Sequence, residues 1–282
     1  MLTFKKLTGN IGVEVTDVDL TRPLPADLVA EIKRAVYEHC AVFFRNQKVF
    51  TDDEHIRVGE TFGQLDISEI QPNPIARREI MVLDQVSPKG EGADNFHRDR
   101  LFLEVPPMGS ILQQVLQPES GGDTCWMSTY AAYDALSAPM QGLLDGLYAR
   151  NSIEPMARRS KKVRDHVGNK INEWPSAIHP VVEVHPETGR KALNVNANWT
   201  QEIVDVPKAE SDMLLAFLFE HVKSPDFQVR FRWNVGDVAF WDNRCAQHFA
   251  VADYTTRRIM RRVALTGTKP VGPRDAELRK AA

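Results

Sequence analysis

Short extended segments, and no regular alternation of strands with helices, most constrain the fold of this sequence. Alternating apolar and polar residues are typical of a strand with one buried face, and a short continuous apolar run is typical of a fully buried strand. Such segments lie near both ends of the chain, at 13–20, 41–45, 227–233, 237–241 and 257–265. Because no βαβ alternation and no internal repeat connects them, we expect a mixed α+β fold with a mainly β core, a sandwich or barrel flanked by helices.

Apolar residues at helical spacing predict the flanking helices. Residues 51–54 (Thr-Asp-Asp-Glu) have the capping-box pattern, in which a threonine side chain and a glutamate three residues later satisfy the first backbone groups of a helix. The predicted helices cover residues 26–37, 51–63, 129–147 and 207–224.

No linker or low-complexity segment divides the chain, so we expect one domain over residues 1–282. Within it we distinguish an N-terminal strand and helix section (1–65), a Pro- and Gly-rich substrate loop (66–95) and a polar, basic, lid-like insertion (154–175). Long loops in compact domains are often functional. The substrate loop leads directly into the most informative motif of the chain.

Composition excludes several classes of function. The net charge is −3, which gives no bulk reason to bind nucleic acid or an anionic membrane surface. The chain has neither an apolar signal segment at its N-terminus nor a run long enough to span a membrane. Three cysteines without a CxxC motif suit neither a disulfide framework nor a zinc knuckle. We expect a soluble cytoplasmic protein, with homo-oligomers as the default assembly.

The motif is His97-Arg98-Asp99, in a segment with an extended pattern. Side chains alternate along a strand, so His97 and Asp99 would face the same side, about 6–7 Å apart at Cα. An imidazole and a carboxylate on one edge are two thirds of the facial triad that holds non-haem Fe(II). The alternative is a pair of ordinary polar loop residues, because an HxD motif alone is weakly specific.

A third ligand would be another histidine. His248 is the best candidate, because it follows a strand and a polar turn and precedes a strand with several arginines. Structural roles suit the histidines in helical patterns better, and two more histidines adjoin a predicted hairpin. These other histidines are His39, His55, His221, His179 and His185.

Arginines on the strand 257–265 supply a second signal. Arg258 and Arg262 share one face of this strand, and two inward guanidiniums can pair with two separate anionic groups. Arg257 and Arg261 share the other face, where a solvated basic edge strand explains them. Thr124, after a glycine pair, can add a hydroxyl donor, although taken by itself it is better explained as a simple turn residue.

Two residues near His248 have plainer explanations. Trp241 is more typical of a core than of a site, and Cys245 is more typical of a buried thiol than of a nucleophile, since no Cys–His–Asn pattern accompanies it.

Ordered motifs along almost the whole chain resemble the taurine dioxygenase / 2,4-D dioxygenase family of Fe(II)- and 2-oxoglutarate-dependent oxygenases. They include Val42-Phe43-Phe44-Arg45-Asn46-Gln47, Phe96-His97-Arg98-Asp99, Gly121-Gly122-Asp123-Thr124, His179-Pro180-Val181-Val182, His185-Pro186-Glu187-Thr188-Gly189-Arg190 and Trp241-Asp242-Asn243-Arg244 through His248 to Arg262. The resemblance implies a double-stranded β-helix, or jelly-roll, core. It also implies an enzyme that converts 2-oxoglutarate and O2 to succinate and CO2 while hydroxylating a small anionic organic substrate.

The resemblance also assigns roles to residues. It implies that Fe(II) is held by His97, Asp99 and His248. Thr124 and Arg258 would bind the distal carboxylate of 2-oxoglutarate. Arg262 would lie nearer the iron, toward the other carboxylate of the cosubstrate and the acidic group of the substrate. Hydroxylation at a carbon next to a heteroatom would release sulfite, sulfate or an alcohol.

Departures from the family pattern concern the substrate. Ser68 replaces a histidine that helps to hold the sulfonate in taurine-type members, which disfavours taurine itself. Arg98 and Arg100 flank Asp99, and side-chain alternation places both on the side opposite the ligands, where they could be surface charges. Arg100 could instead form part of a second contact to an anion. Phe102 is kept from the family's pocket, and Ile153 and Trp199 occupy other pocket positions. These changes favour a different anion with a larger apolar body.

Other outcomes are compatible with these residues. The same iron site can serve desaturation or hydroxylation of an amino-acid-like natural product; halogenation is disfavoured because such enzymes usually lack the carboxylate ligand. A non-enzymatic jelly-roll binding protein would tolerate loss of one ligand or arginine, yet all five positions are present. A zinc hydrolase with the same ligands would have no evident use for Arg258 and Thr124.

Overall fold

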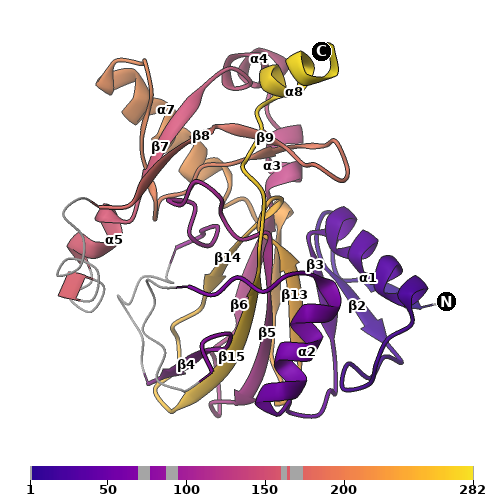
Figure 1. Ribbon diagram of the computed structural model, residues 1–282. Helices are drawn as coiled ribbons and strands as arrows, with labels where there is room; N and C mark the ends of the chain where they lie inside the picture. The colour runs from indigo at the N-terminus through magenta and orange to yellow at the C-terminus, as the bar shows by residue number, and fades with distance from the viewer. Residues whose placement is uncertain (1, 69–76, 87–94, 160–163, 166–173, 282) are drawn as a thin grey trace.

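The computed structural model describes residues 2–68, 77–86, 95–159, 164–165 and 174–281 (Figure 1). Its largest sheet has seven strands, and within it only β2 and β3 pair in parallel. In spatial order the strands are β1 (Thr3–Lys6), β2 (Val13–Thr16), β3 (Ala41–Phe44), β13 (Val238–Asp242), β5 (Gly109–Leu116), β15 (Arg258–Leu265) and β4 (Met81–Gln85). The arginine-rich strand β15 therefore lies inside the sheet, between β5 and β4.

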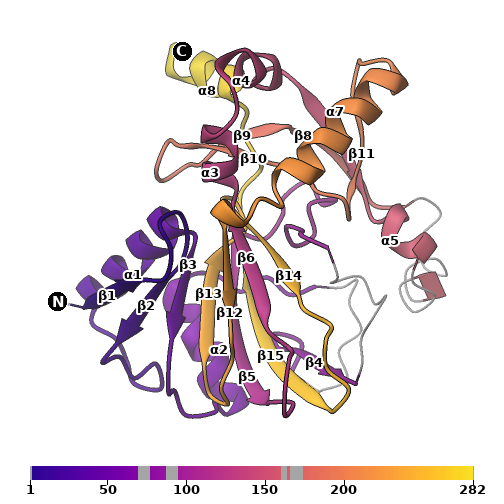
Figure 2. The same cartoon turned by 180° about the vertical axis from the view of Figure 1, so that it is seen from behind.

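A second sheet of three strands packs against the first (Figure 2). Its order is β12 (Gln228–Phe231), β6 (Thr124–Ser128) and β14 (Ala246–Ala250). The two sheets share an aromatic core, in which Trp126 and Phe231 of the small sheet meet Phe43 and Trp241 of the large one. Candidate site residues on β14 and β15 thus come from two facing sheets.

Helices α1 (Ala26–His39) and α2 (Asp52–Phe62) cover the other face of the large sheet. Strand alternation separates the two faces: Val42 and Phe44 of β3 belong to the helix-covered core, whereas Ala41 and Phe43 belong to the inter-sheet core. The predicted capping box of α2 is present, with the Thr51 side chain accepting from the backbone N–H of Glu54.

A third layer closes one end of the two sheets (Figures 1 and 2). It contains a sheet in the order β11 (Thr200–Ile203), β7 (Tyr148–Ser152) and β8 (Ser176–Pro180), and the hairpin β9 (Val182–Val184) with β10 (Lys191–Leu193). Its helical segments are α3 (Thr129–Asp134), α4 (Ala138–Leu144), α5 (Glu154–Arg159), α7 (Lys208–His221), the 3-10 turn η1 (Pro225–Phe227) and α8 (Pro273–Ala281). A separate apolar core lies within this layer.

Much of the predicted secondary structure is confirmed. The fold is mixed, with mainly sheet at its centre, and the helices near 26–37, 51–63 and 207–224 are present. Among the described residues, no helix is long and apolar enough to cross a membrane.

Three predictions of local structure are wrong or incomplete. The single helix over 129–147 is two helices, because Ser137 starts a new helix with Pro139 in its first turn. The extended segment at His97 is a one-residue bridge, and Asp99 already belongs to a turn. His248 precedes the arginine-rich strand β15, as predicted, but it lies within another strand, β14, that was not predicted.

The predicted loops are only partly described. Residues 69–76 and 87–94 of the substrate loop, and 160–163 and 166–173 of the lid-like insertion, lie outside the described residues.

A buried histidine links α2 to the large sheet and makes stability pH-dependent. His55 is fully buried, and its Nε2 donates to the carbonyl oxygen of Ile111 in β5 (3.2 Å). Burial lowers the pKa of His55 from 6.5 to about 4. The unfolded chain therefore binds a proton in this range that the folded protein does not, so stability is lost as pH falls from 6.5 to 4.

We expect this histidine to cost up to about 3 kcal/mol of unfolding free energy at pH 4 relative to pH 7. His55→Gln, which keeps a donor for Ile111, should flatten the slope of stability against pH between 6.5 and 4. Urea titrations of both proteins across this range measure it. Equal slopes for the two proteins would contradict the assignment.

Candidate metal centre and cosubstrate pocket

The two histidines of the candidate metal centre face each other across an isolated antiparallel bridge. The backbone N–H of His97 donates to the carbonyl of His248 (3.0 Å), and that of His248 donates to the carbonyl of His97 (2.9 Å). Directly paired residues have their side chains on the same face. The two imidazoles consequently lie side by side, with ring centroids 4.3 Å apart.

Asp99 completes the cluster from the turn that follows His97. One Asp99 oxygen lies 3.9 Å from Nε2 of His248, and Nη1 of Arg262 donates to both Asp99 oxygens (2.8 and 2.9 Å). Burial by itself raises the pKa of Asp99, but the Arg262 guanidinium and the two histidines outweigh it and hold that pKa well below its usual value. The carboxylate is therefore ionised, as a metal ligand must be.

The histidines are in the state that binds metal. Nδ1 of His97 lies 2.8 Å from the carbonyl oxygen of Asn95, which can only accept, so Nδ1 carries the proton and Nε2 the lone pair. Burial, and then the neighbouring His97, lower the pKa of His248 to about 3, so this ring is neutral near pH 7.

One ligand atom from each of His97, Asp99 and His248 lies within 4.8 Å of the others, and all three side chains are buried. Two neutral imidazoles and one carboxylate on a common side are the donor set of the non-haem Fe(II) facial triad.

A buried guanidinium without full pairing lies on the same inward face of β15. Arg258 is 3% exposed, and its Nε and Nη2 have no hydrogen-bond partner among the described residues. Burial lowers the pKa of Arg258, which is the direction expected for a cation that is not neutralised in place. A buried cation of this kind is costly unless an anion binds it, so the position suits a carboxylate ligand.

Gly122 lies against the Arg258 guanidinium, and Thr124 follows two residues later in the chain. The indole N–H of Trp233 donates to the Thr124 hydroxyl (3.0 Å), which leaves the hydroxyl hydrogen to donate to a ligand. Gly122 has φ +73°, and a Cβ there would lie 3.1 Å from Cδ of Arg258. The glycine therefore allows both the turn and the close approach of the arginine.

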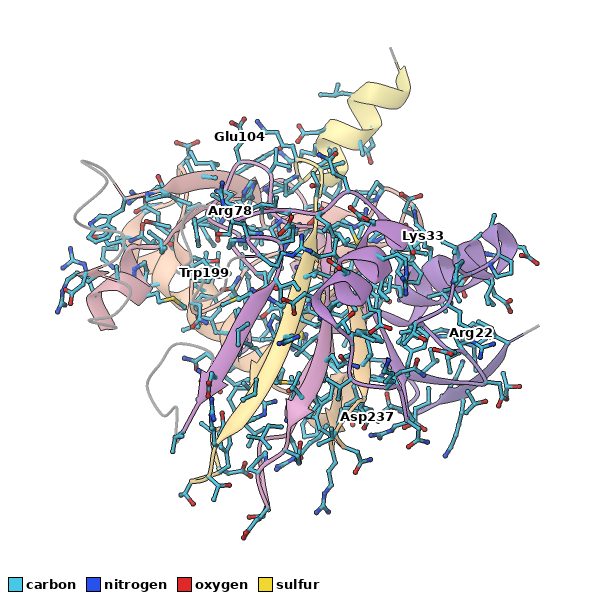
Figure 3. The ribbon with its side chains drawn as sticks, turned by 60° about the horizontal axis from the view of Figure 1, so that its bottom comes forward. Arg22, Lys33, Arg78, Glu104, Trp199 and Asp237 are labelled. Carbon is cyan, nitrogen blue, oxygen red and sulfur yellow. The ribbon has the colours of Figure 1, made fainter. Side chains whose placement is uncertain are left out.

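An apolar wall adjoins His97. Phe102, Ile153 and Trp199 belong to one buried cluster, in which the Phe102 and Trp199 rings lie 4.9 Å apart. The Trp199 ring, labelled in Figure 3, lies 6.4 Å from the imidazole of His97. Its carbonyl accepts from the backbone N–H of Ser152, next to Ile153 (2.8 Å). The structure thus brings together the three apolar residues that the sequence predicted for the substrate.

Of the alternatives left open for Arg98 and Arg100, surface charge is wrong, since the two residues are only 3% and 6% exposed. The side of the motif opposite the ligands is covered by the β9–β10 hairpin, which pairs with Arg98 through Glu183. Arg100 has φ +46° in the turn after Asp99, and this turn ends the strand alternation on which the prediction rested.

Arg100 instead joins the turn to the start of the substrate loop. Its Nη2 lies 3.0 Å from a carboxylate oxygen of Asp66. Ser68, which is half-buried, lies two residues further along this loop. The predicted substrate residues Arg100 and Ser68 therefore come from segments that the ion pair holds together.

The arginines at the start of β15 alternate between the two faces of the sheet, as predicted. Arg258 and Arg262 are buried. Arg257 pairs with Asp84, and Arg261 pairs with Asp52. The prediction that Arg257 and Arg261 belong to a solvated edge strand is wrong, because β15 has a neighbouring strand on each side.

Another buried cluster of metal-ligating residue types is His185, Asp242 and Cys245. Nε2 of His185 pairs with Asp242 (3.0 Å), and its Nδ1 accepts from the backbone N–H groups of Glu187 and Thr188 (both 3.2 Å). Both ring nitrogens are therefore occupied by protein contacts. This cluster is a structural network, and Cys245 is a buried free thiol as predicted.

Some residues at the centre were not predicted. Asn95 fixes the tautomer of His97, and the Ser110 hydroxyl donates to Asp99 (3.3 Å). No pattern in the sequence marks either residue. Trp241 was predicted as core and is fully buried, yet its ring also lies 4.8 Å from that of His248.

Comparison with known proteins gives a consistent result. The profile of the "Taurine catabolism dioxygenase TauD, TfdA family" matches residues 3–264. An α-ketoglutarate-dependent sulfate ester dioxygenase of Pseudomonas putida is 37% identical, covering 94% of this chain and 90% of the relative. An α-ketoglutarate-dependent 2,4-dichlorophenoxyacetate dioxygenase of Cupriavidus pinatubonensis is 35% identical, covering 89% and 92%.

Solved structures agree with the sequence relatives. A taurine dioxygenase from Burkholderia xenovorans superposes with a TM-score of 0.83 at 34% identity, covering 97% of this chain and 94% of the other. These relatives are enzymes, so the alternatives of a non-enzymatic binding protein and a zinc hydrolase are set aside. The chain belongs to the TauD/TfdA family and is an oxidoreductase of the α-ketoglutarate-dependent dioxygenase class.

Proposed function

We propose that this protein is an Fe(II)- and 2-oxoglutarate-dependent dioxygenase that oxidises an alkyl sulfate ester, or a similar small organic anion, at the carbon bearing the heteroatom. The observation that carries the proposal is a buried His–Asp–His donor set beside a buried cation that lacks full pairing. Arg262 contacts the ligand Asp99, and Arg258 lies on the same face of β15.

His97, Asp99 and His248 would hold the iron. Bound Fe(II) would couple oxidative decarboxylation of 2-oxoglutarate by O2 to insertion of one oxygen atom into a C–H bond of the substrate. Arg262 keeps Asp99 ionised and oriented through its contacts to both carboxylate oxygens. In this proposal its remaining donors also face the cosubstrate and the acidic group of the substrate.

The cosubstrate would be oriented by Arg258 and Thr124. The guanidinium Nε and Nη2 of Arg258 would donate to the distal carboxylate of 2-oxoglutarate, and the Thr124 hydroxyl would add a third donor. Charge-assisted hydrogen bonds of this kind are strong in a buried site. They would fix the position of the opposite, 2-oxo acid end at the metal.

The proposed substrate follows from the pocket and the relatives together. The apolar wall of Phe102, Ile153 and Trp199 suits an alkyl body, and Arg100 and Ser68 are the proposed contacts for its anionic group. Sulfate esters are named for the Pseudomonas putida relative, and a 35% identical relative from Acinetobacter baylyi is named an alkylsulfatase. Asp66 already neutralises part of the charge of Arg100, so Arg100 would offer the substrate only its remaining N–H donors, which favours a singly charged group such as a sulfate monoester.

The reaction balances as follows. An alkyl sulfate, O2 and 2-oxoglutarate give succinate, CO2 and the substrate hydroxylated at the carbon next to the ester oxygen. That product loses hydrogen sulfate as its C–O bond breaks and the new hydroxyl becomes a carbonyl. An aldehyde and sulfate result, without attack by water on the sulfur.

We extend the proposal to architecture and setting. The two facing sheets would form a double-stranded β-helix within a single domain over 1–282. The protein would act as a homo-oligomer in the cytoplasm on small molecules, not on nucleic acid or membranes.

His248→Ala should weaken Fe(II) binding more than about a hundredfold, because loss of a ligand exceeds the 10–100-fold effect of losing an outer-shell partner. Equilibrium dialysis under anaerobic conditions measures the affinity. His39→Ala, on the half-exposed end of α1, is the matched control and should bind as the wild type does. Undiminished binding by His248→Ala would refute the ligand assignment.

Arg258→Met should raise the KM for 2-oxoglutarate about 10–100-fold, which corresponds to the roughly 1.5–3 kcal/mol of hydrogen bonds to a charged group. Arg257→Met changes the neighbouring exposed residue on the opposite face and should leave this KM unchanged. Steady-state succinate release tests both. An equal change of the KM for 2-oxoglutarate in Arg258→Met and Arg257→Met would contradict the assignment of Arg258 to the cosubstrate.

A substrate panel tests the substrate class. Succinate release and O2 consumption should be highest with alkyl sulfates of medium chain length and lowest with taurine, because the wall near His97 is apolar. Aryloxy acids and amino acids complete the panel. Taurine turnover equal to that of the best alkyl sulfate would overturn the proposed class, and a missing visible charge-transfer band with Fe(II) and 2-oxoglutarate would overturn the oxygenase itself.

A further inference from the structure

The β9–β10 hairpin lies behind the metal centre and contacts the immediate neighbours of all three candidate ligands. Arg98 stands between His97 and Asp99, and Gln247 directly precedes His248. Both side chains are buried. Each contacts the segment that leaves β10, so one short stretch of backbone is connected to both ligand-bearing parts of the chain.

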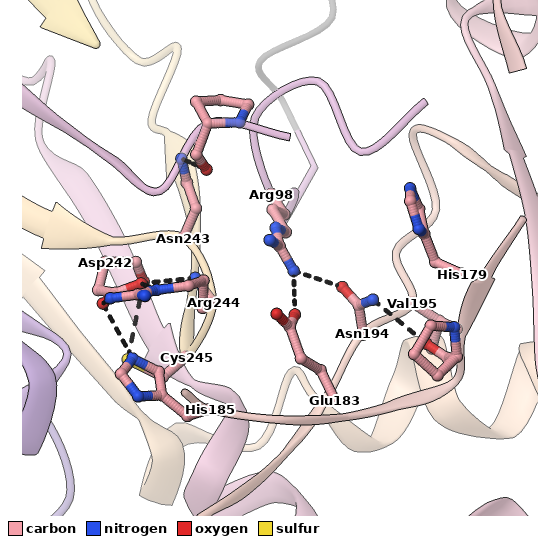
Figure 4. A network of polar contacts seen from close by, with 12 residues as sticks. Arg98, His179, Glu183, His185, Asn194, Val195, Asp242, Asn243, Arg244 and Cys245 are labelled. Atoms are coloured by element: carbon pink, nitrogen blue, oxygen red, sulfur yellow. Dashed lines mark hydrogen bonds and ion pairs between the residues drawn. The ribbon is translucent and has the colours of Figure 1, made fainter. Parts of the chain in front are cut away.

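Arg98 is fixed by two residues of this hairpin region (Figure 4). Its Nη1 pairs with the carboxylate of Glu183 in β9 and donates to Oδ1 of Asn194, just after β10 (2.8 Å). Asn194 is itself held, because its side-chain amide donates to the carbonyl of Pro180 (3.2 Å) and its backbone N–H donates to Val181 (2.8 Å). The residue that accepts from Arg98 is therefore held by two further hydrogen bonds of its own.

Gln247 makes the corresponding contact from the other ligand segment. Its side-chain amide donates to the carbonyl of Val195 (2.8 Å), and Val195 directly follows Asn194. Two consecutive residues thus receive hydrogen bonds from the two segments that carry the ligands.

A second anchor joins the same hairpin to the start of β14. His185, which follows β9, pairs with Asp242 at the end of β13 (3.0 Å), and Arg244 pairs with the same carboxylate (2.6 Å). Figure 4 shows this network beside the one around Arg98. The turn after Asp242 leads directly into β14, so the hairpin also limits movement of that strand.

The backbone of Arg98 is connected to the apolar wall. The indole N–H of Trp199 donates to the Arg98 carbonyl (2.6 Å). Trp199 packs against Phe102 and belongs to the same buried cluster as Ile153. The residue between the two ligands is thereby linked to the surface that would contact the substrate.

Stability alone does not account for Arg98. Its Nε and Nη2 have no hydrogen-bond partner among the described residues, and Glu183 is 1% exposed. Buried ion pairs are often no more stabilising than well-packed apolar residues of the same volume. Fixing the geometry of adjacent groups is a better-supported use for such a pair.

We infer that Arg98 is a positioning residue: the contacts of Arg98 and Gln247 to the hairpin set the placement of His97 and Asp99 relative to His248. This inference rests on the proposed function only in taking the three residues as metal ligands. It predicts that loss of the Arg98 contacts weakens metal binding and uncouples 2-oxoglutarate decarboxylation from substrate oxidation, even where stability is kept.

The test compares Arg98→Met with the double variant Arg98→Met/Glu183→Met, using Co(II) alone as the probe in anaerobic titrations of the metal-free protein. The single variant leaves Glu183 buried without its cation and should lose thermal stability. The double variant removes both charges and should unfold near the wild-type temperature. We expect both to bind Co(II) at least about tenfold more weakly.

Arg45→Met is the matched control, because Arg45 also pairs with a buried carboxylate, that of Asp237. Figure 3 shows Asp237 well away from Trp199. This variant should lose thermal stability and keep the wild-type Co(II) affinity. Wild-type Co(II) affinity in the double variant, or an equal loss of affinity in Arg45→Met, would overturn the inference.

Two further variants keep the test decisive if the double variant does not fold. Glu183→Gln retains an acceptor for Arg98 and should bind Co(II) within about threefold of the wild type, whereas Glu183→Ala should lose affinity as Arg98→Met does. Equal affinities of the two would overturn the inference. Co(II) binding does not require turnover, so a wild type that binds Co(II) but oxidises no substrate would refute the proposed function and still allow this comparison.

Discussion

The backbone bridge between His97 and His248 is the interaction on which the site depends. Its two hydrogen bonds join a loop to the edge of the three-stranded sheet and place both imidazoles on one side. Asp99 reaches the same point from the turn that follows. Arg262 pairs with the carboxylate of this cluster, the β9–β10 hairpin contacts Arg98 between two of its members, and the apolar wall adjoins His97.

Buried charge is arranged unevenly around this point. Asp99 is paired with Arg262, and Asp242 with Arg244, so these carboxylates have local counter-charges. Arg258 differs, because no carboxylate among the described residues pairs with it, and its Nε and Nη2 have no hydrogen-bond partner there. This state of Arg258 supports its proposed role in binding an anionic ligand, whereas the paired charges stabilise the protein's own geometry.

How far the sequence could predict the site is best seen residue by residue. The outward and inward arginines of β15 followed from strand alternation alone, because this strand is regular. Alternation failed at Arg100, where a turn with positive φ ends the strand, and at Arg98, whose outer side is covered by a hairpin distant in sequence. His248 was chosen as the third histidine, but its strand was not predicted.

The sequence by itself determined the mixed, mainly β fold class, the HxD motif, the candidate third histidine and the family, because these depend on local pattern and residue order. Only the tertiary structure decided that Arg98 and Arg100 are buried, that Arg262 pairs with Asp99 and that Phe102, Ile153 and Trp199 form one wall. The physical reason is that burial and pairing depend on which distant segments pack together, and periodicity along one strand contains no information about its partner.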